Sequence, residues 1–450
     1  MITGREAPAA SRRPLFWEPT NMSTYPASCP RSEELFARAR KVMPGGNTRT
    51  TVFIDPFPIY AERGEGCRMW DVDGNVYYDC INNFTAMIHG YAQPEAVAAV
   101  QGQLPLGTAF GAPTQSEIDL AELLVARLPS VEQIRFANSG TEAVMMAIKA
   151  ARAFTDRPKI VKIEGAYHGS YDFAEVSLDS SPQNWGDMPA STAYAKGTPQ
   201  GVLSDVIVVP FNDIEALKAV FHVHGWEIAG VLIDPMPNRA GLIPARRDYL
   251  EALVETAHAA GALVIFDEVI SFRLGYAGAQ GLWNIAPDLT ALGKIIGGGF
   301  PVGAVAGRAE IMAVFDPTRG KPALPHGGTF TANPVTMRAG LAAMGALTSK
   351  AFAHLDYLGA FLRDGTNAAF ERHGLSGRCV GLGSLFRIHF TGNDIVDYRS
   401  VYPSATERRK LNLLHRGLLD RGVLSASYGL FALSTPMTDA EPSSQPSMTR

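Results

Sequence analysis

The chain has 450 residues, of which 46% are hydrophobic and 19% are charged, and this composition excludes an intrinsically disordered protein. Its 40 Lys and Arg residues and 44 Asp and Glu residues give a formal net charge of −4, which excludes a strongly basic nucleic-acid-binding protein. At ~150 residues per domain, the length allows about three domains, or one large domain with an appendage.

The four cysteines indicate a reducing compartment rather than a disulfide scaffold. Cys29, Cys67, Cys80 and Cys379 lie far apart in the sequence and form no zinc-type cluster. We therefore expect free thiols and a cytoplasmic protein. No stretch approaches the roughly 18 to 20 continuous apolar residues of a membrane-spanning helix, and the N-terminal residues lack the apolar core of a secretory signal.

Both ends of the chain are predicted to be tails. Residues 1–30 are rich in Pro, Ser and Ala without periodicity, and residues 441–450 are polar, so we expect a disordered leader and a C-terminal tail. Within residues 31–84, apolar residues recur at helical spacing from Ser32, and residues 58–80 alternate between turn signals. This segment is predicted to form a helix and short antiparallel strands, the first part of a smaller domain.

From about residue 130, short apolar runs alternate with helical patterns. Continuous apolar runs of this length are typical of strands buried on both faces, as in a parallel sheet covered by helices. The predicted fold is therefore α/β, with a large, mostly parallel sheet domain over residues 85–335 and a smaller α+β domain completed by residues 336–440. The predicted strands are residues 133–136, 160–163, 206–209, 228–233 and 262–266.

The polar residues that end these runs are candidates for chemistry, because ligands bind at the carboxyl ends of the strands in such sheets. Ser139, Gly140 and Thr141 follow the strand at 133–136 and open a predicted helix. Backbone amides at a helix N-terminus bind anions, and the two hydroxyls could add hydrogen bonds. A Ser or Thr shortly before Glu142 is also the pattern of a simple helix cap, and that alternative stays open.

A pair of carboxylates, Asp267 and Glu268, follows the buried run that ends at Phe266. A carboxylate at the mouth of a buried strand is costly unless it has a partner, and a protonated ring nitrogen is one such partner. A surface acidic pair or a metal-binding pair would give the same pattern.

Lys294 lies in an apolar, glycine-rich setting, between Gly293 and the segment Ile-Ile-Gly-Gly-Gly. Poor solvation of its ammonium should lower the pKa of this lysine, and a neutral amine is what Schiff-base chemistry requires. A solvent-facing loop lysine is the alternative. The segment is not a phosphate-binding Walker A loop, because Ile rather than Ser or Thr follows the lysine.

A phosphate cradle, a strand-end aspartate and a desolvated lysine are together what pyridoxal 5′-phosphate needs. The phosphate is held, the ring nitrogen is kept protonated, and the aldehyde is bound by the lysine. Tyr167, after the strand at 160–163, could stack on the ring, although a core aromatic is the alternative.

Five motifs of this chain resemble the class III aminotransferases of pyridoxal-phosphate fold type I, over about residues 33 to 440. They are Ser-Gly-Thr-Glu-Ala at 139–143, Tyr-His-Gly at 167–169, Phe-Asp-Glu-Val at 266–269, Leu-Gly-Lys at 292–294 and Gly-Thr-Phe followed by Asn-Pro at 328–334. Residues 287–299 and Arg273 are similar to the glutamate-1-semialdehyde aminomutase branch, whereas residues 44–49 and 64–79 are more similar to the β-amino acid aminotransferases.

The resemblance implies roles for the residues around the cofactor. Lys294 would form the Schiff base and carry the proton, and Asp267 would pair with the pyridine nitrogen. Val269 and Tyr167 would pack on the two faces of the ring. The phosphate would be bound by Gly140 and Thr141, with Ser139 beside them.

Further roles concern the partner subunit and the substrate. Thr329 would reach the phosphate of the neighbouring subunit, so a homodimer with a shared active site is implied. Arg49 would clamp the substrate carboxylate, because a guanidinium suits bidentate recognition, with a surface arginine as the alternative. Gly429 stands where aminomutases have a catalytic-site glutamate, and Tyr428 stands where the β-amino acid enzymes have a mobile arginine for a second carboxylate.

The predicted function is a pyridoxal-phosphate-dependent aminotransferase that moves an amino group from a donor, preferably a β-amino acid, to a keto acid. Tyr428 counts against 2-oxoglutarate and favours pyruvate, an aldehyde or an amine as partners. Glutamate-1-semialdehyde 2,1-aminomutase is the main alternative. An NAD-linked oxidoreductase is disfavoured because no GxGxxG follows the first strands, and a fold without turnover is disfavoured by the presence of Lys294 and Asp267.

Overall fold

The computed structural model describes residues 24–439, so most of the predicted leader and the C-terminal tail lie outside the described residues. The packed chain begins before the predicted boundary at residue 30. Tyr25 and Cys29 are buried and share an apolar cluster with Phe57, Tyr77 and Leu419. Helix α1 (Pro30–Ala39) follows directly, and it is the amphipathic helix that the sequence predicts.

The large domain is built on a seven-stranded sheet with the order β4-β10-β9-β8-β7-β5-β6. All neighbouring pairs are parallel except those that β10 makes with β4 and β9. This arrangement confirms the α/β fold of type I with a large, mostly parallel sheet. The strands are β4 (Gln133–Ala137), β5 (Lys159–Ile163), β6 (Val206–Val209), β7 (Ile228–Ile233), β8 (Leu263–Asp267), β9 (Leu289–Gly293) and β10 (Gly303–Gly307).

Both faces of the sheet are buried by helices. Val264 and Phe266 of β8 pack in one apolar cluster with α9 (Arg247–Ala259), whereas Leu263 and Ile265 pack in another with α5 (Gly140–Thr155). Alternate residues of one strand therefore face opposite helical layers, which explains the continuous apolar runs in the sequence. The other helices of this domain are α3 (Pro94–Gln103), α4 (Gln115–Arg127), α6 (Asp172–Glu175), α7 (Gln200–Ser204), α8 (Ile214–His224), α10 (Glu268–Ser271), α11 (Gly278–Trp283) and α12 (Ala309–Met312).

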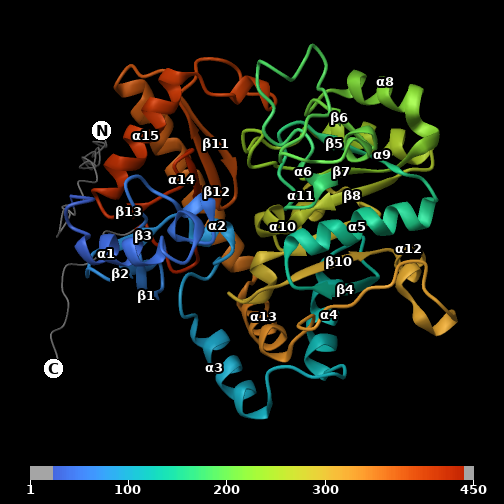
Figure 1. Cartoon of the computed structure of the whole chain (residues 1–450), viewed down its shortest axis with the longest axis horizontal. Coiled ribbons are helices and arrows are strands. Elements are labelled where there is room, and N and C mark those ends of the chain that lie inside the picture. Colours follow the sequence, from blue (N-terminus) through green and yellow to red (C-terminus); the bar gives the residue numbers. More distant parts are fainter. Residues whose placement is uncertain (1–23, 440–450) are drawn as a thin grey trace, which may run out of the picture.

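The smaller domain joins the two ends of the described chain, which lie together in Figure 1 as blue and red segments. Strand β13 pairs in parallel with β3, so residues more than 300 positions apart share one sheet. The predicted antiparallel strands at 58–80 are confirmed, while the domain boundaries at 84/85 and 335/336 stay predictions. The elements are β1 (Ala61–Glu65), β2 (Arg68–Asp71), β3 (Val76–Asp79), α2 (Asn82–Thr85), α13 (Pro334–Ala346), α14 (Ser349–Arg372), β11 (Arg378–Leu382), β12 (Leu385–His389), α15 (Ala405–Leu419), β13 (Val423–Leu424) and β14 (Leu430–Ala432).

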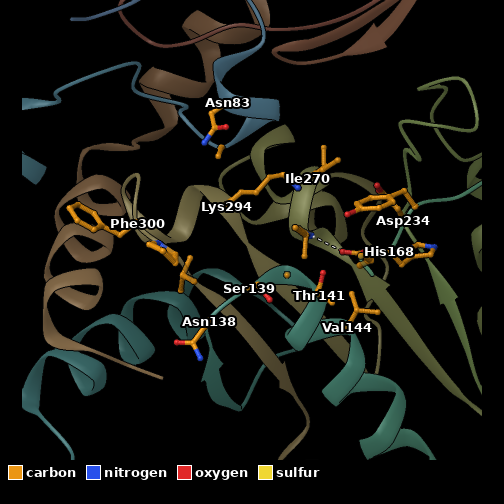
Figure 2. A pocket seen from close by; sticks show the side chains of 18 of the residues that line it. Asn83, Asn138, Ser139, Thr141, Val144, His168, Asp234, Ile270, Lys294 and Phe300 are labelled. Carbon is orange, nitrogen blue, oxygen red and sulfur yellow. Dashed lines mark hydrogen bonds and ion pairs between the residues drawn. The ribbon is translucent and has the colours of Figure 1, made fainter. Parts of the chain in front are cut away.

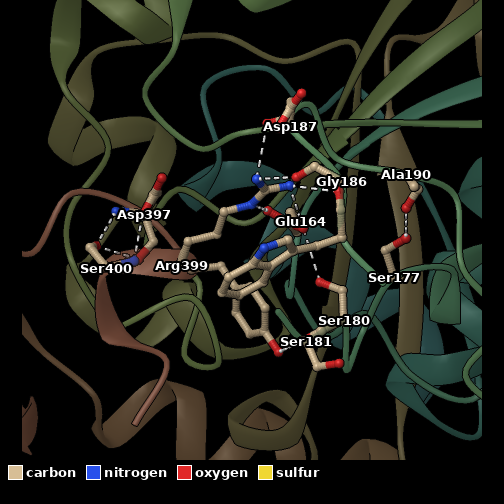
Figure 3. Close-up of polar contacts among 12 residues, drawn as sticks. Glu164, Ser177, Ser180, Ser181, Gly186, Asp187, Ala190, Asp397, Arg399 and Ser400 are labelled. Carbon is tan, nitrogen blue, oxygen red and sulfur yellow. Dashed lines mark hydrogen bonds and ion pairs between the residues drawn. The ribbon is translucent and has the colours of Figure 1, made fainter. Parts of the chain in front are cut away.

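Arg399 ties the C-terminal part of the chain to the large domain (Figure 3). Its Nε and Nη2 donate to both oxygens of the buried Glu164 carboxylate, at 2.7 and 3.2 Å. Its Nη1 donates to the carbonyl oxygens of Gly186 and Asp187, and Nη2 also donates to that of Trp185. This guanidinium is therefore fully occupied by protein acceptors.

Within residues 24–439, no helix combines the length and the apolar character that crossing a membrane requires.

Candidate active site

A cavity of about 600 Å³ opens at the carboxyl ends of β7, β8 and β9, beside the start of α5 (Figure 2). It brings together eight of the ten residues that the sequence predicts to contact the cofactor or the substrate, although they come from segments far apart in the chain. Those residues are Arg49, Ser139, Gly140, Thr141, Tyr167, Asp267, Val269 and Lys294.

The N-terminus of α5 forms one wall of the cavity. Ser139 Oγ accepts a hydrogen bond from the Glu142 amide at 3.1 Å, so the helix-cap alternative is correct for this hydroxyl. The amides of Gly140 and Thr141 precede that bond and carry the positive end of the helix dipole. A Cβ on Gly140 would lie 2.8 Å from Cγ1 of Val269, so glycine at this position lets the start of α5 pack closely against Val269.

The loop that carries Tyr167 packs closely on the same helix start. The Ser170 amide donates to Thr141 Oγ1 at 3.2 Å, and a Cβ on Gly169 would lie 2.5 Å from that oxygen. Gly169 also has a φ of +88°, a conformation that glycine adopts without strain. Tyr167 lines the cavity and is 42% exposed, which excludes the alternative of a core aromatic.

Asp267 is held rigidly at the end of β8. Its Oδ1 accepts from the Val269 amide at 3.0 Å, and its Oδ2 lies 2.8 Å from Nδ1 of His168. Burial lowers the pKa of His168, and because a carboxylate only accepts, the neutral ring donates from Nδ1. His168 Nε2 is buried and has no hydrogen-bond partner among the described residues.

Asp234 is a second buried carboxyl group in the cavity wall, and the sequence reading missed it. Ile233 pairs with Phe266 between β7 and β8, so the residues that follow, Asp234 and Asp267, end neighbouring parallel strands. Burial, followed by the charge of Asp267, raises the pKa of Asp234 to about 7. The signal was present, since Asp234 directly follows a predicted strand just as Asp267 does.

Glu268 faces away from the cavity and stabilises the start of α11. Its carboxylate accepts from the amides of Ala279 and Gln280, at 2.6 and 3.1 Å. Burial raises the pKa of Glu268 to about 7. The two adjacent acidic residues therefore have separate roles, and the pair is neither a surface pair nor a pair that converges on a metal.

Lys294 follows β9 directly and lines the cavity with its side chain (Figure 2). Its φ of +49° is rare for a residue with a side chain, and such strain persists where the surrounding structure enforces it. Burial lowers the pKa of Lys294, while the carboxyl groups of Asp267 and Asp234 oppose that shift. The lysine is thus placed to provide a neutral amine.

Arg49 lines the cavity from a different direction, in the segment before a short 3-10 turn at Thr50–Val52. Its Nη1 donates to Oδ1 of Asn83 at 2.6 Å, and its guanidinium lies 5.2 Å from the centre of the Phe84 ring. The sequence reading missed Asn83, which also lines the cavity.

Two predicted site residues lie elsewhere. Thr329 lines a separate surface cavity with Phe110 and His326, so its predicted contact with a neighbouring subunit stays a prediction. Tyr428 does not line the active-site cavity, because its hydroxyl accepts from Asn238 Nδ2 at 3.1 Å and its ring lies against Arg387.

Most of the chain matches one known protein family. A sequence model of the class-III aminotransferases matches residues 51–435. The chain belongs to the class-III aminotransferases. It is therefore an enzyme of the pyridoxal-phosphate-dependent transferases, as the resemblance of its motifs implied.

Relatives of this class-III aminotransferase carry more than one activity in their names. The chain is 42% identical to the glutamate-1-semialdehyde 2,1-aminomutase of Symbiobacterium thermophilum, over 88% of this chain and 90% of that protein. Among solved structures, it is 53% identical to an omega-transaminase from Sphaerobacter thermophilus, with a TM-score of 0.89 and coverage of 92% and 94%. It is also 39% identical to a β-phenylalanine aminotransferase from Variovorax paradoxus, with a TM-score of 0.83 and coverage of 92% and 91%.

The cavity of this class-III aminotransferase fits pyridoxal 5′-phosphate. Gly140 and Thr141 line the cavity at the N-terminus of α5, where helix amides bind a phosphate, and Asp267 provides a fixed carboxylate for a protonated ring nitrogen. Lys294 supplies the amine from the carboxyl end of the neighbouring strand β9, and Val269 and Tyr167 also line the cavity.

Proposed function

We propose that this class-III aminotransferase takes the amino group from a β-amino acid and passes it, in a second half-reaction, to a keto acid. When bound, pyridoxal phosphate supplies the electron sink for this chemistry. The observation that supports the donor is Arg49, a guanidinium held at the cavity beside Lys294 without a carboxylate partner among the described residues.

Arg49 differs in this respect from Arg399. All three nitrogens of the Arg399 guanidinium donate to protein acceptors, two of them to Glu164 (Figure 3). Arg49 donates one side-chain hydrogen bond, to Asn83, within residues 24–439. Its remaining donors are thus available to a carboxylate ligand, for which the fork of a guanidinium gives two parallel hydrogen bonds.

The cavity wall near Arg49 is apolar. Ala86, Met87, Phe300 and Val302 line it, and they supply surface for the hydrocarbon part of a donor. Arg49 is the one arginine among the described residues that line the cavity. A single guanidinium favours a keto acid with one carboxylate, such as pyruvate, over 2-oxoglutarate with two.

The chain's own groups account for the proton transfers. Lys294, with its lowered pKa, can accept the proton from the amino-bearing carbon of the donor at Nζ and return it by a 1,3-transfer, on the far side of the amino nitrogen. The Asp267 carboxylate is held in a fixed orientation at the strand end, because a histidine N–H and a backbone amide both donate to it. Arg49 fixes the carboxylate end of the donor, so that the reacting carbon faces Lys294.

The backbone at Gly429 counts against the aminomutase alternative. The resemblance places the aminomutase glutamate at this position, where the chain has a φ of +88°. A Cβ here would lie 2.5 Å from the carbonyl oxygen of Ile388, so no longer side chain fits without a backbone shift. The chain thus has neither that carboxylate nor room for it.

The proposed assembly is a homodimer. Large apolar side chains are exposed in the segment that follows α3 and directly after Thr329, with exposed fractions of 69% for Leu106, 52% for Phe110 and 63% for Phe330. Phe330 directly follows Thr329, so a second copy that covered these side chains would bring Thr329 to a subunit boundary. The four cysteines are unpaired, which supports a reducing compartment, and we propose the cytoplasm.

Two half-reactions test the proposed function. The purified enzyme loaded with pyridoxal phosphate is mixed with 3-amino-3-phenylpropanoate without a keto acid, and we expect loss of the visible cofactor absorbance, which pyruvate then restores. Glutamate-1-semialdehyde alone is the comparison substrate. Rapid formation of 5-aminolevulinate, with no response to the β-amino acid, would replace the proposed function by the aminomutase.

A further inference from the structure

Four consecutive residues beside the cavity adopt a left-handed backbone. The φ values are +51° for Asn82, +49° for Asn83, +52° for Phe84 and +76° for Thr85. Each residue with a Cβ costs about 1–2 kcal/mol in this conformation, and left-handed residues normally occur singly rather than in a row. Such a turn persists only where surrounding contacts enforce it, and strain of this kind is concentrated at functional sites.

The left-handed turn (residues 82–85) places two side chains on Arg49. Asn83 Oδ1 accepts from Arg49 Nη1 at 2.6 Å, and the Phe84 ring lies 5.2 Å from the guanidinium carbon. In a right-handed helix or an extended strand, two adjacent residues would not direct both side chains at one group on the same side. The strained backbone therefore fixes the orientation of the guanidinium.

Arg273 donates a hydrogen bond to the last residue of this turn and lies outside the cavity lining. Its Nη1 donates to the Thr85 carbonyl oxygen at 2.7 Å, its Nε donates to Ser384 Oγ at 3.0 Å, and its Nη2 donates to the Leu433 carbonyl oxygen. Arg273 is 1% exposed and does not line the cavity. It has no carboxylate partner among the described residues, and burial lowers its pKa to about 9.

Burial of a guanidinium among neutral partners costs desolvation free energy, so such a group contributes little to the stability of a fold. An apolar side chain of similar volume is often neutral or stabilising at such a site. The three acceptors of Arg273 belong to three separate segments, and one of them is the turn that contacts Arg49. Arg273 also follows α10, which begins directly after Asp267, so the turn is linked to the segment that fixes the cofactor-facing carboxylate.

We propose that Arg273 is a positioning residue for substrate recognition, which holds the left-handed turn and through it the orientation of Arg49 toward the donor carboxylate. This inference rests on the proposed function, because it takes Arg49 to bind that carboxylate. A purely structural Arg273 would affect stability without distinguishing substrates that carry a carboxylate from those that do not.

The experiment compares Arg273→Met with Arg127→Met in the enzyme loaded with pyridoxal phosphate. Arg127 is a matched control, since it is 7% exposed, donates to the Met344 carbonyl oxygen, packs on Tyr276 and does not line the cavity. For Arg273→Met we expect KM for 3-amino-3-phenylpropanoate to rise about tenfold, the usual effect of losing one well-placed charged hydrogen bond. KM for 1-phenylethylamine, which has no carboxylate, should stay within about twofold in both variants.

A binding measurement separates orientation from catalysis. The probe is 3-phenylpropanoate, which carries the carboxylate without an amino group, and its Kd is read from the change in cofactor absorbance. We expect a Kd about tenfold higher in Arg273→Met and unchanged in Arg127→Met. Asn83→Gly is the second variant, because glycine keeps the left-handed backbone without strain while the amide that contacts Arg49 is lost. It should weaken 3-phenylpropanoate binding even if Arg273→Met fails to fold.

The outcomes distinguish the inference from the proposed function. If Arg49→Ala weakens carboxylate binding but Arg273→Met and Asn83→Gly do not, Arg49 binds the donor without help from the turn, and the inference is wrong. If Arg49→Ala itself leaves 3-phenylpropanoate binding unchanged, the proposed donor recognition fails. Equal KM changes for both substrates in Arg273→Met would show a structural role alone.

Discussion

The two halves of the cavity are built from different kinds of structure. On the cofactor side, Ser139, Asp267 and Lys294 stand at the ends of strands β4, β8 and β9, where the sheet fixes their positions. On the substrate side, Arg49 and Asn83 stand outside the sheet, and the Arg49 guanidinium contacts Asn83 through one hydrogen bond and the Phe84 ring through a cation–π contact. The sheet therefore fixes the cofactor side, whereas side-chain contacts between distant segments fix the substrate side.

The largest effect is expected from Lys294→Ala on the cofactor side. Loss of the amine removes both the covalent anchor of the cofactor and the group that moves the proton, so turnover should fall about 10⁴-fold or more. The visible absorbance of the lysine-bound cofactor should disappear, as measured on the purified protein. Lys162→Met is the control, because Lys162 is a buried lysine that donates to the carbonyl oxygens of Ala166 and Val176 instead. Retained absorbance in Lys294→Ala would mean that another lysine holds the cofactor.

Most of the cofactor side could be predicted from the sequence, because apolar runs mark buried strands and polar residues mark their ends. Strands β9 and β10 were not predicted, since runs such as Gly-Ala-Val-Ala-Gly at 303–307 contain small residues with little strand signal. Asp234 carried the same strand-end signal as Asp267 and was overlooked.

The substrate side could not be predicted in the same way. Nothing in Asn-Asn-Phe-Thr at 82–85 indicates a left-handed turn, because the conformation is imposed by Arg273 and by a hydrogen bond from Asn82 Nδ2 to the Ala432 carbonyl oxygen. These partners are 188 and 350 residues away in the chain, and no local pattern reveals them. Tyr428 was placed at the site by resemblance, but its hydroxyl bonds to Asn238 outside the cavity.

Arg399→Met tests whether a guanidinium whose donors all bond to protein acceptors affects stability and not substrate binding. The change leaves Glu164, whose side chain is 2% exposed, without its charge partner, and the free energy of unfolding should fall by about 3 kcal/mol. Urea unfolding measures this loss, and Arg247→Met, which removes an exposed pair with Glu251, should cost about 0.5 kcal/mol or less. KM for β-amino acids should not change. A substrate effect like that of Arg49→Ala would remove the distinction between the two arginines.

Arg49→Ala is expected to act on KM and not on stability. The KM for 3-amino-3-phenylpropanoate should rise about 10-fold to 100-fold, because a charge-assisted interaction with the donor carboxylate is lost. The KM for 1-phenylethylamine should change by about twofold at most. Arg63→Ala is the matched control, since Arg63 also lies over an aromatic ring, that of Trp70, but does not line the cavity. Equal losses on both amines would give Arg49 a structural role.

Asp234→Asn should have the smallest effect, and it concerns the pH dependence of the cofactor side. Burial and the charge of Asp267 raise the pKa of Asp234 to about 7 in the folded protein, above its ordinary value of 3.8. The folded state therefore binds this proton more tightly than the unfolded state, so stability is fully present below pH ~4 and is lost as the pH rises toward about 7. The asparagine variant has no proton to lose.

From pH 5 to pH 8, the melting temperature of the cofactor-free wild type should fall by about 2 °C or more relative to Asp234→Asn, as followed by scanning fluorimetry. Parallel profiles would mean that folding does not raise the pKa of Asp234.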